Sequence, residues 1–313
     1  MVVLRRLAGL ALALFVSSLL VFAFMQVLPG DPARVALGLN AGEEAVARLR
    51  ADFGLDAPLT ERYTEWVGGL LTGDFGTSYL SRMPIGPQIA DRFGVTAWLV
   101  AAAMLVAVVI AVPAGTFAAW RHRRPSGVLV SAASQIGMAI PSFLAGILLI
   151  TLFAVHLRWL PAGGWTAPVL DPIAFVRSLI LPALALGLVQ AAVLTRYVRS
   201  AVLDVLREDY LRTARAKGLR PVPALVRHGL RNASIPVVTV LALQLTTMLV
   251  GAVVVERVFV VPGLGSLLLD AVAARDLLVV QNVVMVLVVA VLVVNLVVEL
   301  LYAMLDPRLS GRR

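Results

Sequence analysis

The sequence predicts an all-α membrane protein with six transmembrane helices and both termini in the cytoplasm. Of its 313 residues 60% are hydrophobic and 14% are charged, and six long runs carry no charged side chain. Soluble domains are usually about 45–50% apolar and about 25% charged. A bilayer core about 30 Å thick needs roughly 20 apolar residues of helix. The charge-free runs are residues 7–28, 95–120, 128–155, 178–195, 232–255 and 277–298.

These runs predict helices rather than the strands of a barrel. Only α-helices and closed β-barrels satisfy every backbone hydrogen bond inside lipid, and barrel strands alternate apolar and polar residues. The runs are continuous stretches of Leu, Val and Ala without that alternation. The first run follows Arg5 and Arg6, as in a signal peptide, but its length and the absence of a small-residue cleavage site predict a retained span.

The distribution of basic residues predicts the orientation of the spans. Cytoplasmic loops of membrane proteins are enriched in Lys and Arg. Placing the N-terminus inside puts 17 of the 27 Lys and Arg residues on the cytoplasmic side. The net charge of +9 therefore reflects topology and attraction to anionic membrane lipid, and nucleic acid is not expected as a partner.

The outer segment between the first two spans, residues 29–94, is too long to be a simple turn. Apolar residues recur in it at helical spacing: Val46, Leu49 and Phe53, then Leu59, Tyr63, Trp66 and Leu70. This spacing predicts two amphipathic helices. Trp66 is a candidate for the headgroup level, where tryptophan is enriched. The segment could be a structural cap or a docking element.

The inner segment between spans four and five, residues 196–231, is here called the elbow. No proline or glycine interrupts residues 196–217, so span four is predicted to continue as a helix that ends at Gly218. Pro223 fits the first turn of a second short helix, residues 224–231. A long basic excursion with an apolar strip suggests a partner surface, and a solvated loop along the lipid is the alternative.

The chain offers little chemistry of its own. It contains no cysteine, its three histidines are scattered, and no P-loop motif for phosphate binding is present. We therefore expect no catalytic residue, metal or cofactor in this chain, so that energy for transport must come from a partner. Ion-coupled carriers usually have intramembrane carboxylates, and the span interiors have none.

Two amides are candidates for a translocation path, Gln244 in span five and Asn295 in span six. Amides inside spans more often form hydrogen bonds between helices, which is the alternative. Small residues at four-residue spacing predict close helix packing in two spans. They are Ala103, Ala107, Ala111 and Gly115 in span two, and Ala183, Gly187 and Ala191 in span four.

Several motifs, in order along nearly the whole chain, resemble those of ABC-importer permeases. Residues 209–219, followed by residues 227–233, resemble the family's cytoplasmic EAA loop. Further matching motifs are residues 28–32, 54–56, 73–78, 262–265, 275–276 and 301–308. Together they are similar to the B-type permease subunit of the dipeptide, oligopeptide and nickel transport family.

This resemblance implies a type I ABC permease in the bacterial inner membrane that imports di- or oligopeptides by alternating access. It implies a second, homologous permease as heterodimer partner and two cytoplasmic P-loop ATPases, which would bind ATP and Mg. A periplasmic or lipid-anchored binding protein would deliver the substrate. Nickel or glutathione are alternative cargoes within the family. An ion-coupled carrier or a structural membrane subunit are alternatives of another class.

The resemblance also assigns roles to residues. Those expected to couple to the ATPases are Tyr210, Arg212, Thr213, Ala214, Ala216, Lys217, Gly218 and Leu219. Those expected to form a periplasmic gate loop are Phe259, Pro262, Gly263 and Gly265. Small alanines permit close approach of a partner, and Gly218 supplies a sharp turn. Arg212 stands where the wider family has glutamate and Thr213 where it has alanine, but the peptide-type branch commonly shows the basic form.

The predicted organisation has three parts. Residues 1–94 hold the first span and the long periplasmic segment with its amphipathic helices. Residues 95–305 form a five-helix permease core that includes the elbow, with its last helix extending to about residue 302. Residues 306–313 are a cytoplasmic tail.

Overall fold

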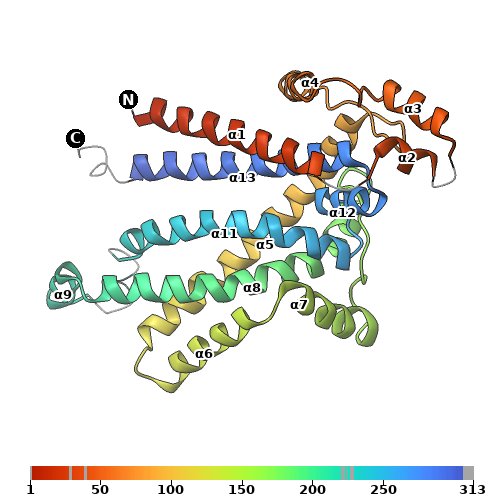
Figure 1. Cartoon of the computed structure of the whole chain (residues 1–313). Helices are drawn as coiled ribbons and strands as arrows, with labels where there is room; N and C mark the ends of the chain where they lie inside the picture. The colour runs from red at the N-terminus through yellow and green to blue at the C-terminus, as the bar shows by residue number, and fades with distance from the viewer. Residues whose placement is uncertain are drawn as a thin grey trace. The chain divides into compact units, whose positions relative to one another are not determined.

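The structure is a computed structural model that describes residues 2–27, 30–38, 41–219 and 229–305, together with residues 223 and 225. Apart from an isolated bridge between Thr77 and Pro84, the regular structure in these ranges is helical (Figure 1). The helices are α1 (Val2–Val27), α2 (Pro32–Leu37), α3 (Glu43–Asp52), α4 (Leu59–Thr72), α5 (Ile85–Trp120), α6 (Pro125–Ala139), α7 (Ser142–Leu149), the π-helix η1 (Ile150–His156), α8 (Pro172–Leu206), α9 (Asp209–Ala216), α11 (Leu230–Val258), α12 (Leu264–Ala274) and α13 (Leu277–Leu305).

In the described part of the chain, five helices are long and apolar enough to cross a membrane. They are α1, α5, α8, α11 and α13, and they correspond to the first, second, fourth, fifth and sixth predicted spans. Pro113, Pro182 and Pro236 lie inside α5, α8 and α11. Membrane helices tolerate such prolines because neighbouring groups satisfy the freed carbonyls. The predicted all-α membrane fold is confirmed.

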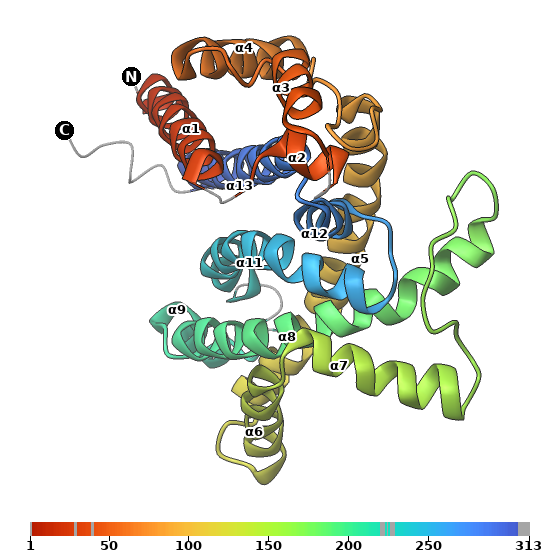
Figure 2. The same ribbon diagram turned by 45° about the vertical axis from the view of Figure 1, so that its right-hand side comes forward.

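The third predicted span, residues 128–155, is not one straight helix (Figure 2). The segments Pro125–Ala139 and Ser142–His156 are bent by 101° relative to each other, and they make a sixth span if the pair is taken as one. Pro141 explains the break, because proline lacks an N–H donor and disfavours the helical conformation in the residue before it. Ile140 accordingly has an extended backbone, with φ −87° and ψ 119°. The prediction of a continuous helix was wrong at this position.

The chain folds as two compact units. The first comprises residues 1–96 and 262–296, and the second comprises residues 97–261 with the described residues from 297 onward. In the first unit α1 lies beside α13, as both views show (Figures 1 and 2). Its apolar core consists of Met25, Ile85, Ile89, Leu264, Ala271, Val279, Val280 and Val283.

The two predicted amphipathic helices of the outer segment are present as α3 and α4. On α3, Val46 and Leu49 are buried together with Ala33 of α2. On α4, the Trp66 ring stacks on Phe22 of α1 with ring centroids 6.1 Å apart. The Trp66 indole N–H donates to Oδ1 of Asn282 in α13 at 3.0 Å. The polar edge of Trp66 is therefore satisfied by Asn282, and the headgroup level of this residue stays a prediction.

In the second unit α8 is the central helix and contacts α6, α7 and α11. Its small residues also let it approach α5 closely. A Cβ added to Gly187 would lie 2.7 Å from the carbonyl oxygen of Ala103, and one added to Gly115 of α5 would lie 2.7 Å from Cβ of Val198. Both distances are shorter than van der Waals contact. The close packing predicted from the small-residue spacing is confirmed.

Replacing Gly187 by alanine is expected to destabilise the second unit, because the new Cβ would overlap the Ala103 carbonyl. Overpacking of this kind typically costs about 1–3 kcal/mol. The thermal unfolding midpoint of the detergent-solubilised protein should fall. It is measured by size-exclusion chromatography of the protein that stays folded after heating. Gly9→Ala in α1 is the matched control, since nothing lies within 4 Å of a Cβ added there. An unchanged midpoint for Gly187→Ala would contradict the close contact of α5 and α8.

Candidate functional site

The elbow begins where α8 ends. The sequence predicts one helix through residue 217, but α8 stops at Leu206 and a separate helix, α9, runs from Asp209 to Ala216. The N–H groups of Arg207 and Glu208 bond carbonyls three residues earlier, each at 3.1 Å, which tightens the last turn. The prediction of a continuous helix was wrong at residues 207–208.

An apolar contact explains why the chain turns at this point. Leu211 of α9 is 1% exposed, and a straight continuation of α8 would leave it in water. Burying a leucine side chain stabilises by about 1.5–3 kcal/mol. Leu211 belongs to a set of buried residues here called the elbow cluster: Val202, Val205, Leu211, Leu225, Ala233 and Val237. These residues come from α8, α9, the segment after α9, and α11.

Gly229 permits the close packing of this cluster. A Cβ added to Gly229 would lie 2.7 Å from Cδ1 of Leu225 and 3.0 Å from Cγ1 of Val205. A polar contact also joins α9 to α11, because Nδ2 of Asn232 donates to the Tyr210 hydroxyl at 3.0 Å. The end of α8, the helix α9 and the start of α11 are therefore packed as one body.

Some of the predicted coupling residues pack against this body, and others are exposed to solvent. Ala214 and Leu219 are partly buried against the elbow cluster, and the Leu219 N–H donates to the Ala214 carbonyl at 3.2 Å. Exposed positions are Thr213, Ala216, Lys217 and Gly218. Arg212 lies in α9, but its side chain falls outside the described part of the structure. These exposed residues lie on α9 and in the turn that follows it.

Gly218 ends this segment with φ +88°, in the left-handed region that favours glycine. Nothing lies within 4 Å of a Cβ added there, so the preference for glycine comes from the backbone angle and not from lack of space. The predicted sharp turn is confirmed. The second short helix predicted for residues 224–231 falls mostly outside the described ranges, and its last two residues, Leu230 and Arg231, already belong to α11.

The predicted gate loop has a buried aromatic residue at its start. Phe259 is fully buried, its ring contacts Gly146, and its carbonyl accepts the Gly164 N–H at 2.8 Å. Within residues 259–265, all of which are described, the left-handed residue is Val260 with φ +53°, and not either glycine. Such a conformation is unusual for a β-branched residue.

Pro262, Gly263 and Gly265 lie at the start of the next helix. Gly263 is the N-cap of α12 and Gly265 lies in its first turn. These glycines therefore serve the entry of α12, and the left-handed residue of this stretch, Val260, precedes Pro262. Pro262 directly precedes the cap residue.

The two candidate path residues lie in different units. Gln244 is buried between α11 and α8, where its Nε2 donates to the Gln190 carbonyl at 3.1 Å. This is the hydrogen bond between helices that the sequence left as the alternative. Asn295 lies half-buried in α13. A role of either residue in translocation stays a prediction.

The elbow is held together by packed apolar side chains. In the described part of the chain, no three His, Asp or Glu side chains are grouped as a metal site would need. Sequence reasoning found the exposed residues of α9 but missed Leu211 and Gly229, which fix the helix in place. An isolated leucine among charged neighbours was the only sign of this contact in the sequence.

Comparison with known proteins identifies the family. The model of the binding-protein-dependent transport system inner membrane component matches residues 111–311, and the model of the N-terminal part of such membrane components matches residues 1–100. The glutathione transport system permease protein GsiC of Escherichia coli (strain K12) is 43% identical over 309 residues, which are 97% of each chain. The protein of the same name from Shigella dysenteriae serotype 1 (strain Sd197) shows the same identity and coverage.

A solved structure supports the same architecture. The crystal structure of an amino acid ABC transporter with histidines matches with a TM-score of 0.50 at 16% identity, covering 70% of this chain and 94% of that chain. The likeness shows the type I permease fold. Permeases of ABC transport systems work with a second permease, ATPase subunits and a binding protein. This chain belongs to the binding-protein-dependent transport system inner membrane component family and is a multi-pass permease of a bacterial ABC importer.

Proposed function

We propose that this permease forms half of the path of an importer for glutathione and peptides of similar size. The observation that carries the proposal is the 43% identity, over 97% of both chains, to permeases named for glutathione transport. Glutathione is a tripeptide, so it falls within the peptide class that the sequence motifs favour.

ATP and Mg would bind to two partner P-loop ATPases, and this chain would hold no cofactor of its own. The exposed residues of α9 would sit against the ATPases, which approach each other on binding ATP. A second, different permease would complete the path, and a binding protein would deliver the substrate at the periplasmic side. Pairing of the elbows would favour one conformation of the path, and hydrolysis would favour the other.

Coupling of this kind requires that the partner's contact with the elbow differ between the two states. It also requires that the elbow not bend away from the spans. The elbow cluster supports the proposal, because it joins α9 to both α8 and α11 through buried side chains. A push on α9 would therefore move two spans together instead of unfolding a loop.

Leu211→Ala is expected to loosen the elbow. Truncating a buried leucine costs about 2–5 kcal/mol, and local opening exposes the backbone to proteases. Trypsin should then cut the elbow of the variant, which is rich in arginine, at least tenfold faster in inside-out vesicles. Thr213→Ala is the control, because the Thr213 side chain is exposed and bonds only the Asp209 carbonyl within α9. Equal cleavage of Leu211→Ala and wild type would contradict a packed elbow.

Gly218→Val is expected to abolish ATP-dependent glutathione uptake while the chain still inserts in the membrane. Valine strongly disfavours the φ of +88° at this position, whereas asparagine tolerates the left-handed region. Gly218→Asn should therefore keep most of the uptake. The measurement is uptake of radiolabelled glutathione into vesicles, normalised to the amount of assembled transporter. Normal uptake by Gly218→Val would remove this turn from the coupling mechanism.

A further inference from the structure

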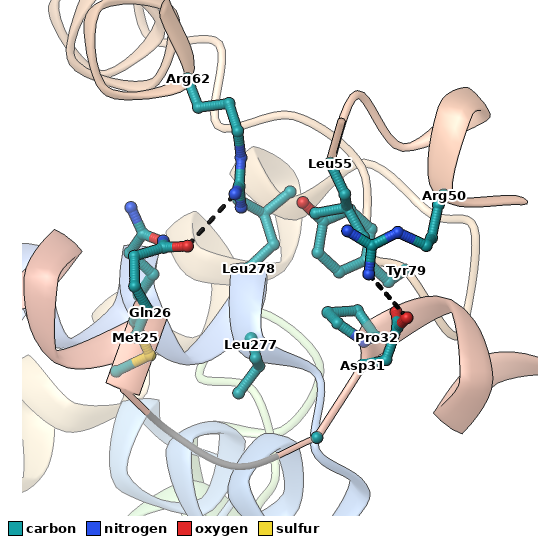
Figure 3. Close-up of a pocket in the computed structure, with 12 residues that line it drawn as sticks. Met25, Gln26, Asp31, Pro32, Arg50, Leu55, Arg62, Tyr79, Leu277 and Leu278 are labelled. Atoms are coloured by element: carbon teal, nitrogen blue, oxygen red, sulfur yellow. Dashed lines mark hydrogen bonds and ion pairs between the residues drawn. The ribbon is translucent and has the colours of Figure 1, made fainter. Parts of the chain in front are cut away.

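We infer that the first unit contains a site, on the periplasmic side, that binds a carboxylate group of the transported solute through Arg62. The inference rests on the proposed function, because glutathione and peptides carry free carboxylates. The site is a hollow of about 340 Å³ lined by the end of α1, the chain entering α2, the helices α3 and α4, and the start of α13 (Figure 3). Its size suits part of a small peptide, since ligand pockets span roughly 300–1,000 Å³.

Arg62 is the central group of this site. It extends from α4 into the hollow, where its guanidinium donates to Oε1 of Gln26 at 3.2 Å (Figure 3). That amide is its only hydrogen-bond partner among the residues that the structure describes, and none of the described carboxylates pairs with it. A guanidinium has five N–H donors, and it prefers a bidentate carboxylate. Most of the donor capacity of Arg62 is therefore available.

The second arginine of the hollow, Arg50, is already neutralised. Its Nη1 lies 2.7 Å from Oδ2 of Asp31, and its Nε lies 3.1 Å from Oδ1 of Asp56. Burial alone would raise the pKa of Asp31, but the hydrogen bonds from Arg50 and the Ala33 N–H outweigh it, and the pKa lies below its ordinary value. Asp31 therefore stays ionised near neutral pH. Arg50 has a structural role here, and the positive charge available to a ligand is that of Arg62.

Two neutral donors face the same hollow. Gln281 of α13 is only 6% exposed, yet its side-chain amide has no hydrogen-bond partner in the described ranges. The amide lines the hollow, where its NH2 group can donate to a polar occupant. The Tyr79 hydroxyl also has no described partner, and burial raises the pKa of Tyr79, which keeps it protonated as a donor. The guanidinium of Arg62, the amide of Gln281 and the hydroxyl of Tyr79 can donate hydrogen bonds to the two oxygens of a carboxylate.

The adjoining hollow, of about 260 Å³, shares Arg62, Tyr79 and Gln281 and also contains Glu65 and Asp74. Asp74 accepts the Gly76 N–H at 2.9 Å, and Glu65 is exposed. Neither forms an ion pair with Arg62. The donors of Arg62, Tyr79 and Gln281 can thus be reached from two hollows and are not paired with the nearby acids.

The test measures equilibrium binding of radiolabelled glutathione to the assembled transporter in nanodiscs, without its binding protein. Arg62→Gln should weaken binding roughly ten- to hundredfold, as expected for a lost charge-assisted contact. Tyr79→Phe should weaken it roughly two- to tenfold, and it keeps the ring that packs on Phe53 at 4.4 Å between centroids. Arg48→Gln is the matched control, because Arg48 is exposed, pairs with Glu44 and lies outside the hollow.

The probe itself provides a second control. Glutathione diethyl ester lacks free carboxylates, so its weak binding should not change between wild type and Arg62→Gln. Equal glutathione affinity of wild type and both hollow variants would overturn the site. Absence of glutathione binding to the wild-type transporter, with Arg62→Gln instead weakening attachment of the binding protein, would overturn it too, because the hollow would then receive an acidic side chain of that protein.

Failure of the proposed function can be distinguished from failure of this site. The wild-type system is assayed in parallel for ATP-dependent uptake of glutathione and of the dipeptide Ala-Ala. Absence of both would reject the proposed cargo class. Normal uptake with unchanged binding by Arg62→Gln and Tyr79→Phe would reject only the site.

Discussion

Close packing of helix backbones along α8 is the constraint on which the second unit depends. Lipid tails are as apolar as leucine side chains, so helices inside a membrane gain little from burying apolar surface and must associate by contact instead. At Gly187 and Gly115 the backbones of α5 and α8 approach so closely that a single methyl group would overlap a neighbour. The same helix, α8, also contacts α6, α7 and α11, so these helices pack around it.

The elbow packs against the end of the same helix, α8. The last turns of α8 supply Val202 and Val205 to the elbow cluster, and Leu211 returns α9 onto them. A helix as short as α9 would be marginal in water by itself. The packing of Leu211 therefore fixes the positions of the exposed residues of α9. Under the proposed function, a fixed surface of this kind would let partner ATPases move α8 and α11 together.

The first unit is built differently, with polar groups placed between its helices. Trp66 reaches Asn282 across the unit, and Arg50 ties Asp31 to Asp56. The charges of Arg50, Asp31 and Asp56 are therefore paired within the protein. By contrast, Arg62 and the donors around it are only partly satisfied by the protein, so they are available to a ligand.

The spans, their orientation and the helices α3 and α4 could be predicted because charge-free length, basic-residue bias and apolar spacing are local properties of the sequence. The break at Pro141 was also visible locally, but the length of the apolar run masked it. The turn at residues 207–208 could not be predicted, because it depends on the distant contact of Leu211 with Leu225. Likewise the left-handed residue within residues 259–265 is Val260 rather than a glycine, and only tertiary structure reveals that.

The most direct measurement is the distance between α8 and α9 during turnover. The chain contains no cysteine, so spin labels can be placed at the exposed positions Leu188→Cys and Ala216→Cys and compared by double electron–electron resonance in the assembled transporter. A packed elbow predicts one narrow distance distribution that is the same without nucleotide and with ATP trapped. A distribution that broadens or shifts with nucleotide would show that α9 moves independently of α8, and would contradict coupling through a rigid elbow.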